Sequence, residues 1–251
     1  MKLARLPDGS PEVFHTLQGE GLSLGRPAVF IRASLCNLHC RWCDTDYTWN
    51  WEGTPWPHDR DGEAGYHKYR REEQIIELPP AEVAALASRF PCRHLVLTGG
   101  EPLLQQDEFA EVLKLLREGD ASWTAEVETN GTLIPSPGLD ALIAHFNVSP
   151  KLANAGMPEE KRLVPEALAW FTENPRAWFK FVVRNEKDLA EVTTVQERLG
   201  FTPDRVFLMP EGRSPEELQD RATWLAEVCR DRGFRFTDRL HVRLWGPARG
   251  R

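Results

Sequence analysis

The sequence has 251 residues, of which 41% are hydrophobic and 27% charged, and a formal net charge of −7. This balance is typical of a globular protein with a sizeable core. Proteins that bind duplex nucleic acid or anionic membranes present concentrated basic faces, and the nearest approach to one here, 68–71, is followed by Glu72 and Glu73. No apolar stretch approaches the ~20 residues of a membrane span, and the first residues lack the apolar core of a signal peptide. We therefore expect a cytoplasmic protein that binds neither nucleic acid nor membranes.

Short β-branched or apolar runs alternate with helical patterns along most of the chain. The runs lie at 28–31, 94–97, 125–128, 146–149, 179–183, 206–209 and 240–244. Strands that alternate with helices predict an α/β fold with a mostly parallel sheet. About six repeats are visible, fewer than the eight of a full barrel. We therefore expect a partial, TIM-like (β/α)6 barrel that forms a single domain over residues 1–251, with its chemistry at the carboxyl ends of the strands.

Apolar residues at helical spacing predict two helices in particular. Their buried faces would carry Phe109, Val112, Leu113 and Leu116 in the first and Leu218, Ala222, Leu225 and Cys229 in the second. Ser214 is placed to cap the second helix, with Pro215 at its first position and Glu217 in a capping box.

Two segments depart from the repeating pattern. Residues 47–73 form a long polar stretch with several glycines and prolines and with Trp49, Trp51 and Trp56. Long irregular insertions in compact domains are commonly functional, so we expect an inserted loop beside the active site. Residues 245–251 follow the last predicted strand and are expected to form a C-terminal extension.

Three of the five cysteines, Cys36, Cys40 and Cys43, fall within eight positions with the spacing C-x3-C-x2-C. This crowding favours a reducing compartment and a metal site over disulfides. Three thiols on one tight loop can reach three corners of an iron–sulfur cubane and leave the fourth iron open, whereas ferredoxins close the cluster with a fourth Cys. Zinc held by the three cysteines and His39 is the alternative, although His39 lies between two of them and the paired C-x-x-C knuckles usual for zinc are missing.

The cysteine spacing after a predicted strand resembles the signature of the radical S-adenosylmethionine (radical SAM) superfamily. Further motifs narrow the resemblance: Leu17-Gln18-Gly19-Glu20-Gly21, Pro27 to Arg32, Cys43-Asp44-Thr45, Thr98 to Pro102, Glu128 to Gly131, and Ser149-Pro150-Lys151. This ordered set is similar to the 7-carboxy-7-deazaguanine synthase family over about residues 14–244. The cysteine motif marks the superfamily, whereas the 17–21 motif and the Asp-Thr pair after the third cysteine mark the family.

The resemblance implies a usually dimeric enzyme of 7-deazapurine (queuosine) biosynthesis. It would convert 6-carboxy-5,6,7,8-tetrahydropterin to 7-carboxy-7-deazaguanine and ammonia. S-adenosylmethionine would bind the open iron of a [4Fe–4S] cluster, would be cleaved by an electron from the reduced cluster, and would be regenerated in each turnover. Magnesium would assist, and a flavodoxin or ferredoxin would supply the electron.

The resemblance also assigns residues to these groups, and it assigns no catalytic side chain because the radical forms on the cofactor. The [4Fe–4S] cluster would be held by Cys36, Cys40 and Cys43, and Mg²⁺ by Thr45. S-adenosylmethionine would contact Trp42, Cys43, Asp44, Gly100, Ser149, Pro150, Lys151, Met209, Pro210, Glu211 and Gly212. The pterin substrate would contact Leu17, Gln18, Gly19, Glu20, Arg32 and Thr98. Without the resemblance, Trp42 fits a hydrophobic plug equally well, Thr45 a turn residue, and Arg32 a surface salt bridge.

Three features are less closely tied to the family pattern. Met209 stands where the family commonly has Gln. Several members end soon after the last strand and place their terminal carboxylate near the substrate, whereas this chain continues to residue 251. Glu128 and Asn130 follow a predicted strand and could orient a ribose or be ordinary turn residues.

Two other functions stay open at this point. A radical SAM activase, which makes a glycyl radical on a protein partner, would need an open groove; the 17–21 motif and Thr45 argue against it. A non-catalytic zinc or iron–sulfur binding module would not need the full α/β core that this length and pattern predict.

Overall fold

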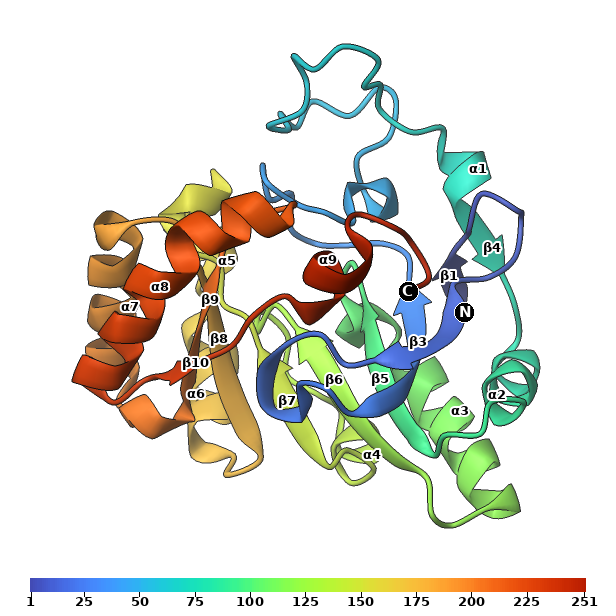
Figure 1. Ribbon diagram of the computed structural model, residues 1–251. Helices are drawn as coiled ribbons and strands as arrows, with labels where there is room; N and C mark the ends of the chain where they lie inside the picture. The colour runs from blue at the N-terminus through green and yellow to red at the C-terminus, as the bar shows by residue number, and fades with distance from the viewer.

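The computed structural model describes residues 1–251 and is built around one mixed sheet with helices on its outer side (Figure 1). The strands are β1 (Lys2–Ala4), β2 (Val13–Leu17), β3 (Pro27–Ala33), β4 (Ile75–Glu77), β5 (His94–Gly99), β6 (Thr124–Thr129), β7 (His145–Val148), β8 (Ala177–Val183), β9 (Val206–Pro210) and β10 (Arg235–Phe236). The helices are α1 (Arg71–Gln74), α2 (Pro80–Ser88), α3 (Gln106–Gly119), α4 (Pro137–Asp140), α5 (Glu159–Arg162), α6 (Pro165–Glu173), α7 (Glu186–Leu199), α8 (Pro215–Arg232) and α9 (Leu240–Trp245).

The sheet has the strand order β10-β9-β8-β7-β6-β5-β3-β1-β4, with β2 paired to β3 off this path. From β3 to β10 all neighbours are parallel. The first six of these strands, β3 and β5 to β9, correspond to the first six of the seven apolar runs identified in the sequence. At the other edge β1, β2 and β4 pair in antiparallel fashion. The sequence did not predict these three strands; β1 and β4 have three residues each, too few to show a period.

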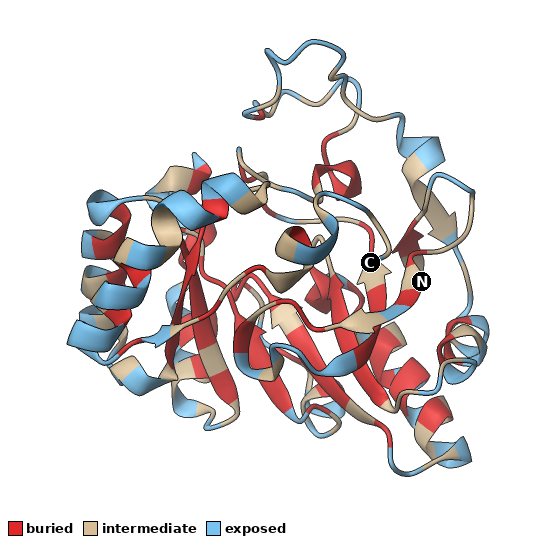
Figure 2. Ribbon diagram, in the orientation of Figure 1, coloured by how far each residue is buried: buried red, intermediate tan, exposed pale blue.

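The strands are apolar on both faces, but the two faces have different partners. The main core joins 39 buried residues between the sheet and the helices, among them Leu95, Leu97 and Val127. Val96, which lies between Leu95 and Leu97 in β5, points to the opposite, inner face of the sheet. There it packs with Phe14, Ala28 and Phe30. Figure 2 shows the resulting pattern, with buried strands and with helices that expose their outward faces. Because side chains alternate along a strand, every second residue faces the inner side of the sheet.

The last predicted strand, 240–244, is wrong: these residues begin the short helix α9. The apolar residues of this run do not share a face, because Val242 is buried whereas Leu244 is 52% exposed. The sheet edge next to β9 is occupied instead by β10. The chain then returns across the carboxyl ends of the strands, where the backbone N–H of Leu240 donates to the carbonyl oxygen of Gly19 at 2.9 Å.

Both helices predicted in detail are present. The four apolar residues predicted for α3 are all buried. Of the four predicted for α8, Leu218, Leu225 and Cys229 are buried, whereas Ala222 is only half-buried. The Ser214 hydroxyl caps α8 by accepting from the N–H of Glu217. The Glu217 carboxylate accepts from the N–H of Arg213, one residue before the cap, so the second bond of the capping box is shifted.

The stretch 47–73 is largely irregular and packs against the cysteine loop. Its buried His58 donates from Nε2 to the carbonyl oxygen of Cys43 at 2.9 Å, and the N–H of Asp59 donates to the carbonyl oxygen of Arg41 at 2.7 Å. Trp49 is buried and lines the cavity described below. None of the helices combines the length and apolar character needed to cross a bilayer.

Candidate functional site

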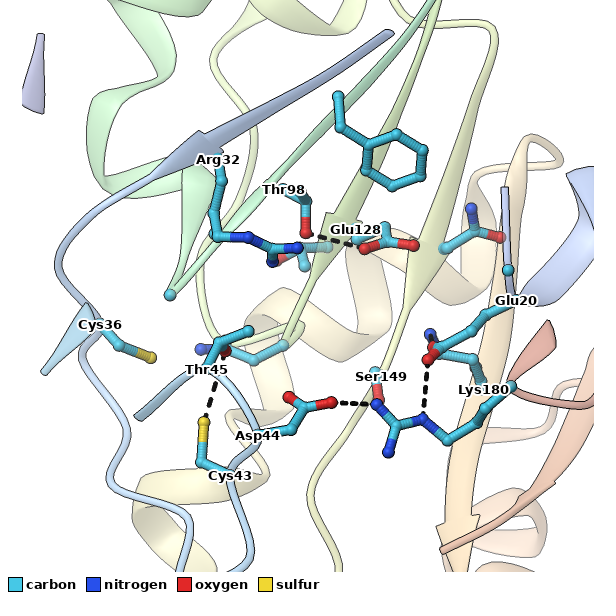
Figure 3. Close-up of a pocket in the computed structure, with 18 of the residues that line it drawn as sticks. Glu20, Arg32, Cys36, Cys43, Asp44, Thr45, Thr98, Glu128, Ser149 and Lys180 are labelled. Carbon is cyan, nitrogen blue, oxygen red and sulfur yellow. Dashed lines mark hydrogen bonds and ion pairs between the residues drawn. The ribbon is translucent and has the colours of Figure 1, made fainter. Parts of the chain in front are cut away.

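The inner face of the sheet becomes polar near the carboxyl ends of the parallel strands. Arg32 of β3 lies opposite Thr98 of β5 in the strand register, and Glu128 of β6 lies opposite Asn147 of β7. Lys180 of β8 continues this row, and all five side chains line one cavity; Figure 3 shows Arg32, Thr98, Glu128 and Lys180 in it. The strand register therefore brings together residues that are far apart in the sequence.

The segment after β3 places Cys36, Cys40 and Cys43 on the wall of the same cavity, and Figure 3 shows Cys36 and Cys43 there. All three thiols are free. Burial raises the pKa of each thiol, that of Cys40 to about 12. The charge of a neighbouring cysteine raises the pKa of Cys36 and Cys40 further. Buried thiolates of like charge need a cationic partner, so this donor set fits an iron–sulfur cluster.

The structure contains no comparable arrangement of side chains for a single metal ion. No group of three or more His, Cys, Asp or Glu side chains is arranged to hold one metal ion. His39 does not line the cavity. Its ring lies 4.3 Å from that of Trp56 and 5.2 Å from that of Trp49, centroid to centroid, and burial with the nearby Lys161 lowers its pKa to about 4. The geometry gives no support to His39 as a zinc ligand.

Close backbone packing holds the cysteine loop against the end of β5. A Cβ atom at Gly100 would lie 2.2 Å from the carbonyl oxygen of Leu35 and 2.8 Å from Cβ of Cys36. Gly99 has a φ of +147° and would bring a Cβ within 2.2 Å of the Ala33 carbonyl oxygen. Both positions therefore require glycine, which explains the Gly-Gly pair that the sequence places after this strand.

An ion-pair network closes the side of the cavity near α9. Glu20 pairs with Lys180 and, at 3.1 Å, with Arg239, and Arg239 also pairs with Asp44. Burial alone would raise the pKa of Glu20, but the charges of Lys180 and Arg239 outweigh it and hold the pKa well below its usual range. Glu20 is therefore ionised and already paired. Its predicted contact with the substrate stays a prediction.

Glu128 is a cavity carboxylate without a direct ion pair, although its charge contributes to the raised pKa of Lys180. Its oxygens accept from the Thr98 hydroxyl at 2.8 Å and from Nε2 of Gln18 at 3.1 Å, and it forms no salt bridge. The side chain of Gln18 is almost fully buried, at 1% exposure. Glu128 therefore keeps acceptor capacity for a ligand in the cavity, a role that the sequence left undecided.

Behind Glu128, β6 carries a second carboxylate, Glu126, which is fully buried. It accepts from Gln18 at 2.5 Å and from Asn147 at 3.2 Å on one oxygen, and from His145 at 2.7 Å and His94 at 3.1 Å on the other. Burial would raise the pKa of Glu126, but the bonds from the two histidines outweigh it and lower the pKa. All its acceptor positions are directed at donors, so Glu126 is a fixed anion beneath the site.

Arg32 and Thr45 were predicted to bind the substrate and Mg²⁺, and both line the cavity. Arg32 donates from Nε to Glu12 at 2.9 Å, which leaves its two terminal nitrogens without a protein partner. The hydroxyl of Thr45 lies 3.5 Å from Sγ of Cys43. Both side chains are near the cysteine loop, where their predicted ligands would have to lie.

The predicted S-adenosylmethionine contacts divide into two groups. Trp42, Asp44, Gly100, Ser149 and Lys151 line the cavity with the cysteines, whereas Pro150 does not. The indole N–H of Trp42 donates to Asn154 at 3.0 Å, and Nζ of Lys151 donates to the Ser149 hydroxyl at 2.9 Å.

The structure does not bring the segment 209–212 to the cavity. Met209 and Pro210 are buried at the end of β9. Glu211 lies 3.7 Å from Arg184, and the carbonyl oxygen of Gly212 accepts from Arg239 at 2.6 Å. Their predicted cofactor contacts stay predictions.

Several residues that line the cavity were missed by the sequence reasoning, namely Phe14, Phe30, Asn147, Lys180, Arg239, His241 and Arg251, whereas Trp49 belongs to the stretch 47–73 that was expected beside the active site. Lys180 had a usable signal, because a charge between Phe179 and Phe181 indicates the polar face of a strand. His241 had none, since its segment was predicted as a strand, and Arg239 lies directly before that segment.

The parallel sheet with its outer helices and the cysteine loop at the strand ends are the features of a radical SAM protein, and residues 31–149 match the Radical SAM superfamily. The chain is 39% identical to 7-carboxy-7-deazaguanine synthase from Pyrobaculum aerophilum over 96% of either chain. It is 34% identical to the protein of the same name from Halobacterium salinarum, over 94% of this chain and 90% of that one. The chain belongs to the 7-carboxy-7-deazaguanine synthase family.

The fold agrees with this assignment. The crystal structure of QueE from Escherichia coli is similar with a TM-score of 0.65 and 26% identity, and covers 96% of this chain and 95% of its own. The predicted partial barrel of the radical SAM type is thereby confirmed. Membership of the superfamily implies a [4Fe–4S] cluster and S-adenosylmethionine.

Proposed function

We propose that this chain catalyses the radical SAM ring contraction of 6-carboxy-5,6,7,8-tetrahydropterin to 7-carboxy-7-deazaguanine and ammonia, a step of 7-deazapurine (queuosine) biosynthesis. The observation that carries the proposal is the composition of one cavity. Three free thiols line one part of its wall, and the strand-end row of Arg32, Thr98, Glu128 and Lys180 lines another. A cofactor bound by the thiols would then face a substrate bound by these four strand-end side chains.

The cysteines are the residues that would hold the cluster, and Trp42, Asp44, Gly100, Ser149 and Lys151 would border S-adenosylmethionine. When bound, the cluster supplies the electron that cleaves S-adenosylmethionine. The protein supplies orientation and a cavity of matched charge. The Gly-Gly pair lets the backbone approach the cofactor closely.

The substrate has two recognisable ends, and the cavity offers a partner for each. The free terminal nitrogens of Arg32 form the planar fork that suits a carboxylate. The unpaired carboxylate of Glu128, oriented by Thr98, accepts hydrogen bonds and so suits the N–H edge of the pterin. Glu20 stays ionised and holds Lys180 and Arg239 in place on the remaining wall.

The proposal includes three further elements. Thr45 would contribute a hydroxyl to a Mg²⁺ ion that also binds the substrate carboxylate, since Mg²⁺ prefers oxygen ligands and keeps several waters. The electron would come from a flavodoxin or ferredoxin. The enzyme would act as a homodimer.

The test is an anaerobic reconstitution with iron and sulfide, followed by reduction and addition of S-adenosylmethionine, Mg²⁺ and 6-carboxytetrahydropterin. Formation of 7-carboxy-7-deazaguanine is the expected result. Cleavage of S-adenosylmethionine without that product would retain the superfamily chemistry and refute the substrate. A protein that binds zinc and takes up no cluster would refute the whole proposal.

A further inference from the structure

The carboxylate of Glu12 is fully buried, just before β2, between two arginines. Its Oε1 accepts from Nε of Arg32 at 2.9 Å and from the Tyr47 hydroxyl at 3.1 Å. Its Oε2 accepts from Nη2 of Arg249 at 3.0 Å. One oxygen therefore serves the arginine of the substrate cavity, and the other serves an arginine of the C-terminal extension.

Arg249 occupies a socket built from several elements. Besides Glu12, it donates to the carbonyl oxygen of Arg5 at 2.7 Å and to Oε1 of Gln74 at 3.2 Å. Its guanidinium carbon lies 3.5 Å from the centre of the Tyr47 ring. Charge, directed hydrogen bonds and ring stacking together anchor the segment 245–251 at this point.

The division of the Glu12 carboxylate has a consequence for Arg32. A carboxylate with no other partner would bind a guanidinium through both oxygens, because the bidentate arrangement is the stronger one. With Oε2 held by Arg249, Glu12 makes only one bond to Arg32, through Nε, and the terminal nitrogens stay free beside the cavity.

We propose that Glu12 and Arg249 are positioning residues that keep the Arg32 fork available for the carboxylate of the substrate. Arg249, which does not itself line the cavity, thus connects the C-terminal extension to the substrate site. This inference rests on the proposed function, because it assumes that a carboxylate-bearing pterin enters the cavity.

The test compares two fluorescent probes, 6-carboxypterin and unsubstituted pterin, on the reconstituted protein with S-adenosylmethionine bound. In Arg249→Ala, both carboxylate oxygens of Glu12 are expected to accept hydrogen bonds from the guanidinium of Arg32. Affinity for 6-carboxypterin should then fall roughly tenfold to hundredfold, the effect of losing a charged hydrogen bond, while affinity for pterin stays the same. Arg249→Lys keeps a cation on Oε2 and should recover part of the loss. In turnover, KM for the carboxylated substrate should rise more than kcat falls.

Arg230→Ala is the matched control, because Arg230 is exposed on α8 and bonds only to the adjacent Asp231; it should bind both probes as the wild type does. If Arg249→Ala does not fold, as judged by circular dichroism and cluster absorbance, the affinities of Arg249→Lys for the two probes are compared with those of the wild type instead. Equal losses for both probes, or no loss for 6-carboxypterin, would overturn the inference. A wild type that does not prefer 6-carboxypterin to pterin would instead overturn the proposed function.

Discussion

The buried anion Glu126 allows a prediction whose size follows from its contacts. Its carboxylate accepts from four donors, on Gln18, Asn147, His94 and His145. In Glu126→Gln a single carbonyl oxygen can accept from two of them, and the new amide group adds donors of its own. Two unpaired buried donors cost about 1–3 kcal/mol each. Because the imidazoles can change tautomer to accept from the new amide, we expect the lower half of that sum, about 2–4 kcal/mol.

The assay is thermal unfolding of the cluster-free chain in reductant, followed by circular dichroism at pH 7. For a chain of this size the loss corresponds to a fall in Tm of roughly 4–16 °C. The control is Glu111→Gln on the exposed face of α3, which should change stability by less than about 0.5 kcal/mol.

The pH dependence gives a second check on the same variant. The pKa of Glu126 in the folded state is below the unfolded value of 4.5. Its ionised form therefore stabilises the fold above pH 4.5, and this contribution is lost as the pH falls below that value toward the folded pKa. The variant has no such titration, so the gap in Tm should narrow between pH 7 and pH 4. A Tm at pH 7 within 2 °C of the wild type, or a gap that widens on acidification, would refute the account.

Three other substitutions test the cysteine loop and the metal site. Gly100→Ala should prevent cluster reconstitution, measured by iron content and absorbance, because the Cβ would overlap the Leu35 carbonyl oxygen. Cys40→Ala should abolish the cluster and all turnover, whereas Cys229→Ala, in the core beneath α8, should retain both; residual turnover in the first would show that Cys40 is not a ligand. Thr45→Ala should take up a normal cluster but respond less to Mg²⁺, and an unchanged magnesium titration would remove Thr45 from the metal site.

The sequence predicted those parts of the fold and site whose signal is local. Alternating strands and helices produced the six parallel strands, and the i, i+3, i+4, i+7 spacing located the buried face of α3. The three cysteines needed only their own spacing and the strand before them. The Gly-Gly pair at 99–100 likewise marked a place where the backbone must approach another segment.

The wrong predictions concerned residues whose structure depends on contacts with distant parts of the chain. Residues 240–244 alternate like a strand, but β10 already occupies the sheet edge beside β9, so the chain turns into α9 instead. The same error concealed His241, which lies in that helix and lines the cavity, as does Arg239 directly before it.

The sequence by itself determined the fold class, the cysteine donor set and the order of the strand-end motifs, because each arises from residues close together in the chain. Only the tertiary structure decided which carboxylates in the cavity are free. Glu20 forms ion pairs with Lys180 and Arg239, whereas Glu128 forms no salt bridge. The physical reason is that an ion pair depends on distances between strands and helices more than a hundred residues apart, and the packing of the sheet sets those distances.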